Sequence, residues 1–262
     1  MKELFKYYIE AEEVIFKYAS GASEKTGKEF HPFNEIILFL KGDAELISEN
    51  IHAKIQPNTL IFIPKETYHQ LKINGDPENY LRCTISFPDI LELKSVTDGL
   101  NDIKLLECDS DFSYMFEKLI KHSKNPNSVS KQSLKAFLTL ITCEITLKKD
   151  TFIKEISQNE IVTSVITYVN ENLSKDISIP EIARFVNISN SSLSHLFKKE
   201  MNISIHQYVI KKRLIAAHNK INSGIYSTTA ALECGFNDYS GFYKQYKKMF
   251  GYPPSQKTKT SD

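Results

Sequence analysis

Ala183 and Ala231, 48 residues apart, open two segments that share one residue pattern. An internal repeat limits the fold strongly, because each copy must form the same supersecondary unit. Each copy contains a small residue, a turn residue, a helix N-cap residue, apolar residues at four-residue steps and paired lysines. These are Ala183, Asn187, Ser189, Leu193, Phe197 and Lys198-Lys199 in the first copy, and Ala231, Gly235, Asp238, Phe242, Tyr246 and Lys247-Lys248 in the second.

Each feature of the repeat has a physical role in two helices joined by a tight turn. The alanines let the helices cross closely, and Asn187 and Gly235 tolerate the positive φ that a tight turn requires. Ser189 and Asp238 are residue types that accept hydrogen bonds from the free N–H groups at a helix start. A single copy also fits a plain helical bundle. Two copies with paired lysines favour two helix-turn-helix units that bind DNA.

The charge distribution agrees with a nucleic-acid partner at one end of the chain. Residues 161–262 hold 13 Lys+Arg and 7 Asp+Glu, a net charge of +6. Residues 1–160 hold 20 and 25, a net charge of −5. A basic half that contains the repeat, beside an acidic half, indicates that only the C-terminal domain meets nucleic acid.

Short apolar runs separated by turn residues predict a β-rich N-terminal domain, a sandwich or a barrel. The runs are Glu35–Leu40, Ala44–Ile47, Thr59–Ile63 and Leu81–Phe87. After Asp109 the apolar spacing becomes helical. The first predicted helix has an apolar face made by Phe112, Met115, Phe116, Leu119 and Ile120, and a second helix is predicted over Val129–Lys148.

The sequence also predicts the compartment. No apolar run approaches the roughly 18 residues that span a bilayer, and the N-terminus has no signal-peptide pattern. The cysteines, Cys83, Cys108, Cys143 and Cys234, lack the spacing of a zinc or redox motif. We expect free thiols in a cytoplasmic protein without a membrane partner.

The C-terminal pattern resembles the AraC/XylS family of transcription regulators over Ile166–Ser255. In this family, glycine usually stands at the position of Asn202, and larger apolar residues at those of Ser227 and Ala230. The resemblance implies a sequence-specific DNA-binding transcription regulator with double-stranded DNA and RNA polymerase as partners. It rests on Ile179, Ile182-Ala183, Ser189, Leu193, Phe197-Lys198, Arg213-Leu214, Ala217, Ala231, Gly235-Phe236, Asp238, Phe242, Gly251 and Pro254.

The resemblance implies how DNA is read. A central helix over Ile205–Asn222 holds the recognition helices so that they enter successive major grooves, roughly 34 Å apart. The positions matched to base edges are Ser191, Ser194, His195, Tyr239, Ser240, Tyr243 and Lys244. Those expected at phosphates are Lys198, Lys199, Lys211, Arg213, Lys247 and Lys248, with a structural ion pair as the alternative role for Arg213.

The N-terminal domain resembles a cupin barrel with trailing helices. His31, Glu35 and Gly42 match the first cupin motif, and Pro64 and His69 match the second. The fold class expected is therefore α+β in two domains, with a cupin-like β-barrel followed by an all-α domain of two helix-turn-helix units.

The two resemblances together imply a division of labour along the chain. Residues 1–150 are expected to sense an effector and to dimerise, 151–160 to form a linker, and 161–262 to bind DNA. Dimerisation in the family uses a helix such as Val129–Lys148, and packing of that helix on its own barrel is the alternative. Its apolar stripe is Leu134, Phe137, Leu138, Ile141 and Ile145.

The cupin motifs allow two kinds of site. An apolar pocket with a few polar groups would bind an uncharged or anionic small molecule, with neither cofactor nor metal. Alternatively, His31, Glu35 and His69, joined by Glu29, would hold a divalent ion. We expect the first, because Glu29 stands where a metal-binding cupin has histidine. The expected pocket lining is His31, Phe33, Glu35, Tyr68, His69 and Arg82, with Arg82 facing inward.

Three functions follow from these alternatives. The favoured one is a ligand-responsive transcription activator with no catalytic residues and no enzymatic activity. The second is a metal-dependent cupin enzyme fused to a DNA-binding domain. The third is a regulator that responds to no ligand.

Overall fold

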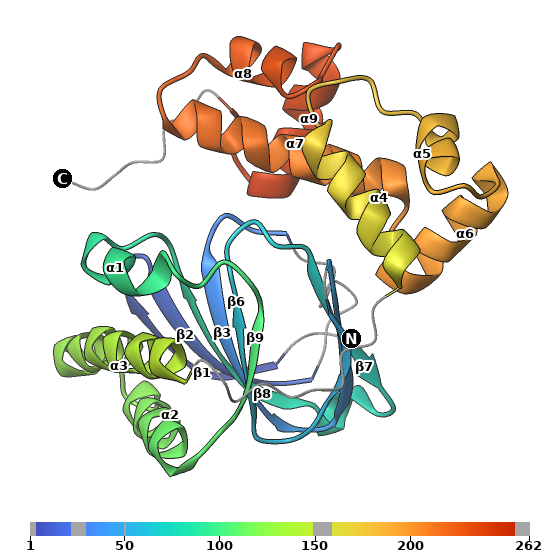
Figure 1. Cartoon of the computed structure of the whole chain (residues 1–262). Helices are drawn as coiled ribbons and strands as arrows, with labels where there is room; N and C mark the ends of the chain where they lie inside the picture. The colour runs from blue at the N-terminus through green and yellow to red at the C-terminus, as the bar shows by residue number, and fades with distance from the viewer. Residues whose placement is uncertain (1–3, 22–29, 50, 149–158, 255–262) are drawn as a thin grey trace. The chain divides into compact units, whose positions relative to one another are not determined.

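The computed structural model describes residues 4–21, 30–49, 51–148 and 159–254 (Figure 1). The chain divides into two compact units, Met1–Ser157 and Gln158–Asp262. The predicted linker, 151–160, lies outside the described residues except for its last two. As predicted, the first unit is β-rich with trailing helices and the second is helical.

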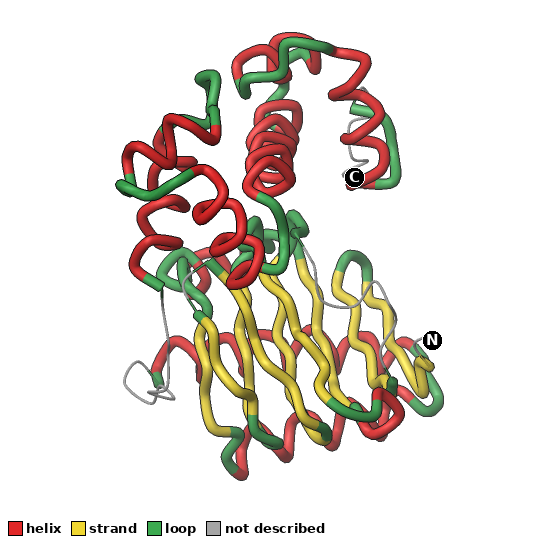
Figure 2. The backbone as a smooth tube through the Cα atoms, turned by 90° about the vertical axis from the view of Figure 1, so that its right-hand side faces the viewer, coloured by secondary structure: helices red, strands yellow, loops and turns green. Residues whose placement is uncertain are grey.

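The strands of the first unit form two antiparallel sheets. One sheet has the order β1-β2-β8-β3-β6-β9 and the other β5-β4-β7. In Figure 2 the strands run side by side in yellow. Their bounds are β1 Leu4–Ala11, β2 Val14–Ser20, β3 Asn34–Lys41, β4 Asp43–Ser48, β5 His52–Ile55, β6 Thr59–Ile63, β7 His69–Asn74, β8 Leu81–Phe87 and β9 Lys104–Glu107.

The two sheets face each other across an apolar core. Ile37 and Ile61 of the larger sheet belong to the same buried cluster as Leu46 and Leu71 of the smaller sheet. The opposite face of the larger sheet packs against helices, so its central strands are covered on both sides. This explains why β3 and β6 read as nearly continuous apolar runs and not as alternating ones.

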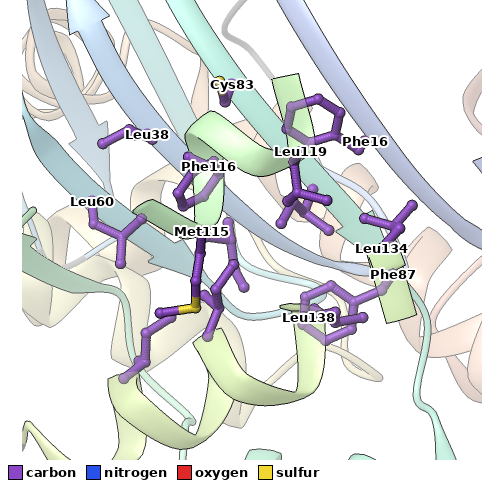
Figure 3. Close-up of a cluster of buried hydrophobic side chains, with 14 of the residues drawn as sticks. Phe16, Leu38, Leu60, Cys83, Phe87, Met115, Phe116, Leu119, Leu134 and Leu138 are labelled. Carbon is purple, nitrogen blue, oxygen red and sulfur yellow. The ribbon is translucent and has the colours of Figure 1, made fainter. Parts of the chain in front are cut away.

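Two helices cover the outer face of the larger sheet. They are α2, Ser110–Ser123, and α3, Ser128–Leu147, preceded by the short helices η1 Pro77–Asn79, η2 Leu91–Leu93 and α1 Lys94–Thr97. Figure 3 shows Met115, Phe116 and Leu119 of α2 beside side chains of the sheet. Asp109 and Asn127 cap the two helices with side-chain hydrogen bonds to their first N–H groups.

The apolar stripe of α3 packs on its own domain. Leu134, Leu138, Ile141 and Ile145 are at most 3% exposed and belong to the cluster beneath the helix. This is the alternative given in the sequence analysis, in which the helix packs on its own domain. A dimer would need a different surface.

The second unit contains six helices among its described residues. Their bounds are α4 Glu160–Glu171, α5 Ile179–Phe185, α6 Asn190–Met201, α7 Ile205–Asn222, α8 Ser227–Glu233 and α9 Tyr239–Phe250. Asn187 and Gly235 have φ of 56° and 83°, which is the turn geometry that the repeat predicts. Ser189 and Asp238 cap α6 and α9 through their side chains, also as predicted.

A chain of polar side chains that includes the buried His218 and Tyr246 links α7 to α9. Asn222 Nδ2 lies 2.8 Å from His218 Nε2, and His218 Nδ1 lies 2.7 Å from the Tyr246 hydroxyl. If the amide of Asn222 donates to Nε2, Nδ1 carries the proton and donates to Tyr246. The imidazole also stacks on Phe250, with ring centroids 4.3 Å apart.

We expect His218 to make the second unit sensitive to acid. Burial lowers the pKa of His218 below its ordinary value of about 6.5. Below about pH 6.5, His218 is protonated more readily in the unfolded chain than in the folded one. The free energy of unfolding therefore keeps its full value above about pH 6.5 and decreases as the pH falls toward the pKa of the folded state. Denaturant unfolding at pH 7 and pH 5.5 should show a smaller acid loss for His218→Gln than for the parent protein. An acid loss equal to that of the parent would exclude His218 as its source, and exposed His206→Gln is the control.

No described helix is both long and apolar enough to cross a membrane. All four cysteines are free thiols, as their spacing predicts.

Candidate nucleic-acid interface and histidine cluster

The first recognition helix, α6, separates a packing face from an exposed face. Leu193 and Phe197 are at most 1% exposed, and Phe197 meets Tyr208 of α7 with ring centroids 5.7 Å apart. Ala183 of α5 is also buried, so the two helices of this unit pack closely. The residues predicted to contact DNA all lie on the exposed face: Ser191, Ser194, His195, Lys198 and Lys199.

The second recognition helix, α9, has the same division. Phe242 and Tyr246 are fully buried in a cluster with Ala231 of α8. The exposed face carries the predicted contacts Tyr239, Ser240, Tyr243, Lys244, Lys247 and Lys248. The sequence analysis therefore predicted correctly that these six residues are exposed on α9.

Tyr239 has a partner that the sequence analysis missed. Its hydroxyl lies 2.8 Å from the Ser227 hydroxyl at the start of α8. Ser227 is a departure from the family pattern, and its small polar side chain gives Tyr239 a fixed hydrogen-bond partner. No sequence spacing indicates this pair, because it depends on how α8 and α9 cross.

Arg213 on α7 is committed to backbone groups of its own domain. Its Nε donates to Leu173 O at 2.8 Å, Nη1 to Gly235 O at 2.8 Å and Nη2 to Lys175 O at 2.5 Å. The guanidinium thus ties the segment after α4 to the turn between α8 and α9. This geometry argues against the predicted phosphate contact. It favours the alternative structural role, in which Asp176 also interacts with the charge of Arg213.

Gly235 is fixed by the same contact. A β-carbon at this position would lie 2.8 Å from Arg213 Cζ and 2.8 Å from Leu173 O. Glycine is therefore required both by the positive φ and by the close approach of Arg213. Lys211, in α7, is half-buried. Its predicted phosphate contact stays a prediction.

In the first unit, the structure brings His31, Glu35 and His69 together. His31 precedes β3, Glu35 lies in β3, and His69 opens β7 of the other sheet. Glu35 Oε2 lies 3.5 Å from both His31 Nε2 and His69 Nε2. All three residues are buried, and the predicted ligand atoms lie within 4.8 Å of one another.

The environment of this cluster favours a negative charge on Glu35. Burial by itself raises the pKa of the carboxyl group, but the interactions with His31 and His69 outweigh it and hold the pKa at about 2. Phe33 stacks on His31, with ring centroids 3.9 Å apart. The cluster therefore contains four of the residues predicted to line a pocket.

Strand register places Arg82 away from this cluster. Glu35 pairs with Ser86 on β8, whereas Arg82 pairs with Phe39 at the other end of the same strands. Four residues of strand place Arg82 about 13 Å from the row of Glu35. Arg82 donates to Gly21 O and lies over the ring of Tyr80, and Tyr68 packs beside Phe30.

Comparisons with known proteins agree on the class of protein. A family model described as a helix-turn-helix domain matches residues 182–260. The chain is 25% identical to the probable transcriptional regulator LumQ of Photobacterium leiognathi, over 86% of this chain and 89% of that protein. It is 26% identical to the lactose operon transcription activator of Staphylococcus xylosus, over 92% of this chain and 81% of that protein.

This chain is a transcription regulator with an AraC-type helix-turn-helix domain. A solved structure of a probable AraC family transcriptional regulator from Rhodopseudomonas palustris is 30% identical and covers 37% of this chain and 93% of that one, with a TM-score of 0.35. The matched family region, 182–260, begins in α5 and includes both recognition helices of the regulator.

Proposed function

We propose that the regulator is a ligand-responsive transcription activator that reads two successive major grooves with α6 and α9. The observation that carries this proposal is the shared geometry of these helices. Each buries an apolar face against its own unit and exposes a polar face that ends in two lysines. Such a face offers side chains for base edges and cations for the flanking phosphates.

The proposed contacts fall into two groups. The base readers are Ser191, Ser194, His195, Tyr239, Ser240, Tyr243 and Lys244. The phosphate contacts are Lys198, Lys199, Lys211, Lys247 and Lys248. Arg213 is left out, because its guanidinium is occupied by three carbonyls.

Activation, effector and partners extend this proposal. The name of the S. xylosus relative describes an activator of an operon, which supports activation by this chain. We assign the N-terminal domain the role of sensing an effector, and the chain a role as a homodimer that meets RNA polymerase. We assign the regulator no enzymatic activity.

We expect DNA binding that is sequence-specific and steeply dependent on salt. Five phosphate contacts per chain predict a slope of about −4.5 for log affinity against log salt for each bound subunit, or a loss of about 10²–10³-fold per subunit between 50 and 200 mM salt. The measurement is fluorescence anisotropy of the full-length regulator on a sequence selected from a random DNA library. Equal affinity for selected and random DNA would refute specific reading, and a flat salt dependence would refute the phosphate contacts.

Substitutions in the two groups should differ in kind. His195→Ala and Lys244→Ala remove proposed base readers, so each should weaken binding to the selected sequence by about 1–3 kcal/mol and relax its preference. Lys248→Ala removes a proposed phosphate contact and should weaken selected and random DNA alike. A uniform loss for His195→Ala on both kinds of DNA would remove it from the readers.

A further inference from the structure

The cluster of His31, Glu35 and His69 has the donor arrangement of a metal site. His31 Nδ1 lies 2.8 Å from Phe33 O, and His69 Nδ1 lies 3.0 Å from Thr67 O. A carbonyl oxygen only accepts hydrogen bonds, so both Nδ1 atoms carry protons. Each Nε2 lies toward the Glu35 carboxylate, and an imidazole that is neutral there presents a lone pair to a metal ion.

This arrangement brings three atoms that can ligate a metal ion within 4.8 Å of one another. His31 Nε2 is buried and has no hydrogen-bond partner, although it lies 3.5 Å from Glu35 Oε2. A buried polar atom without a partner is costly. A cation at the centre of the three atoms would give His31 Nε2 a partner and would balance the charge of Glu35.

The distances suit a metal ion. Two ligand atoms at about 2.1 Å from an ion and at a tetrahedral angle lie about 3.4 Å apart. Both Nε2-to-Oε2 separations are 3.5 Å. The hydrogen bonds of Nδ1 to backbone carbonyls also resemble the outer contacts that orient metal-binding histidines.

We propose that His31, Glu35 and His69 bind one divalent first-row transition-metal ion. Two imidazole nitrogens and one carboxylate oxygen favour Zn²⁺, Co²⁺, Ni²⁺, Fe²⁺ or Mn²⁺ over the oxygen-binding Mg²⁺ and Ca²⁺. Three protein ligands leave at least one coordination position open. The sequence analysis favours a site without metal, because Glu29 departs from the cupin pattern. A site of three protein ligands does not require a fourth ligand at position 29. Glu29 itself lies outside the described residues.

The site would join the two sheets of the first unit. Glu35 belongs to the larger sheet and His69 to the smaller one, so an ion bound to both is a cross-link between them. Metal binding should therefore raise the melting temperature of the full-length protein, because a ligand that binds only the folded state stabilises it. This inference goes beyond the proposed DNA-binding function and does not depend on it.

The test measures metal binding by the full-length regulator after chelator treatment and removal of the chelator. Titration with Co²⁺, followed by its visible absorbance, and with Zn²⁺, followed by calorimetry, should give one ion per chain and a higher melting temperature. Mg²⁺ should give neither effect. Glu35→Gln and His69→Gln should each lower the Co²⁺ affinity at least about 100-fold, since loss of a direct ligand exceeds the effect of losing an outer contact.

His52→Gln is the matched control. His52 Nε2 also lies 3.4 Å from a carboxylate oxygen, that of Glu45, but this pair is partly exposed. The control should keep the wild-type affinity. Wild-type protein that binds no Co²⁺ or Zn²⁺, or Glu35→Gln protein that keeps its affinity, would overturn the proposal.

Two further measurements keep the test decisive. Circular dichroism of the metal-free variants reports folding, and if Glu35→Gln fails to fold, His31→Gln replaces it. If the wild-type protein binds no metal ion per chain, this result alone excludes the site. DNA binding is measured on the same proteins, so loss of specific DNA binding contradicts the proposed function while leaving the metal site standing.

Discussion

Gly235→Ala should destabilise the C-terminal domain by about 3 kcal/mol. A left-handed backbone costs an L-residue about 1–2 kcal/mol, and the new β-carbon would also meet Leu173 O and the guanidinium of Arg213 at 2.8 Å. Moving Arg213 weakens hydrogen bonds from a charged donor, worth about 1.5–3 kcal/mol. Thermal unfolding of the full-length protein should show the transition of this domain lowered by about 10 °C or more.

Gly224→Ala is the control for the backbone contribution. Gly224 has a φ of 95°, but no atom lies within 4 Å of the position that its β-carbon would take. This variant should therefore lose only about 1–2 kcal/mol. In the Arg213→Ala background, the further cost of Gly235→Ala should shrink, because the clash with the guanidinium is gone and only the contact with Leu173 O remains. Equal losses for Gly235→Ala and Gly224→Ala would contradict the proposed constraint by Arg213.

The helical domain was predictable because its signals are local. A turn residue and an N-cap residue act within a few positions of themselves, so Asn187, Ser189, Gly235 and Asp238 indicate the two turns without any knowledge of the fold. The central helix was expected over Ile205–Asn222 and has those bounds.

The β-rich domain was only partly predictable. The runs that became β3, β4, β6 and β8 are apolar and bounded by turn residues, whereas β1, β2, β5, β7 and β9 were not identified. These strands mix charged and apolar residues, as in Lys104–Glu107. Whether such a segment pairs depends on a partner far along the chain, and β9 pairs with β6 more than 40 residues earlier.

Side-chain roles were harder to predict than side-chain positions. Burial and exposure on α6 and α9 follow from the helical period, so the exposed residues were identified correctly. The role of Arg213 depends on carbonyls 40 and 22 residues away in the sequence. Likewise Arg82 and Glu35 were expected to share one pocket, but strand register separates them, and register is not visible in a single strand.

Phe242→Ala should have the largest effect of any single truncation in α9. Phe242 is fully buried and packs beside Phe236, Tyr239 and Tyr246, with ring centroids 5.0, 5.6 and 5.4 Å away. Deleting such a ring removes its burial and leaves a cavity, at a cost of about 3–5 kcal/mol. A typical domain is stable by only about 5–15 kcal/mol. Thermal unfolding should show a large loss of stability, and specific DNA binding should fall with the folded fraction as temperature rises.

Tyr243→Ala, at the next position of the same helix, should show the opposite pattern. Tyr243 is 36% exposed and is a proposed base reader. Its truncation should leave the melting temperature nearly unchanged, because surface substitutions away from a cap or core usually cost less than about 0.5 kcal/mol. It should weaken binding to the selected DNA by about 1–3 kcal/mol at a temperature where both proteins are folded. A Tyr243→Ala protein that melts as early as Phe242→Ala would show that this face of α9 packs on protein, and the assignment of α9 as a DNA-reading helix would fail.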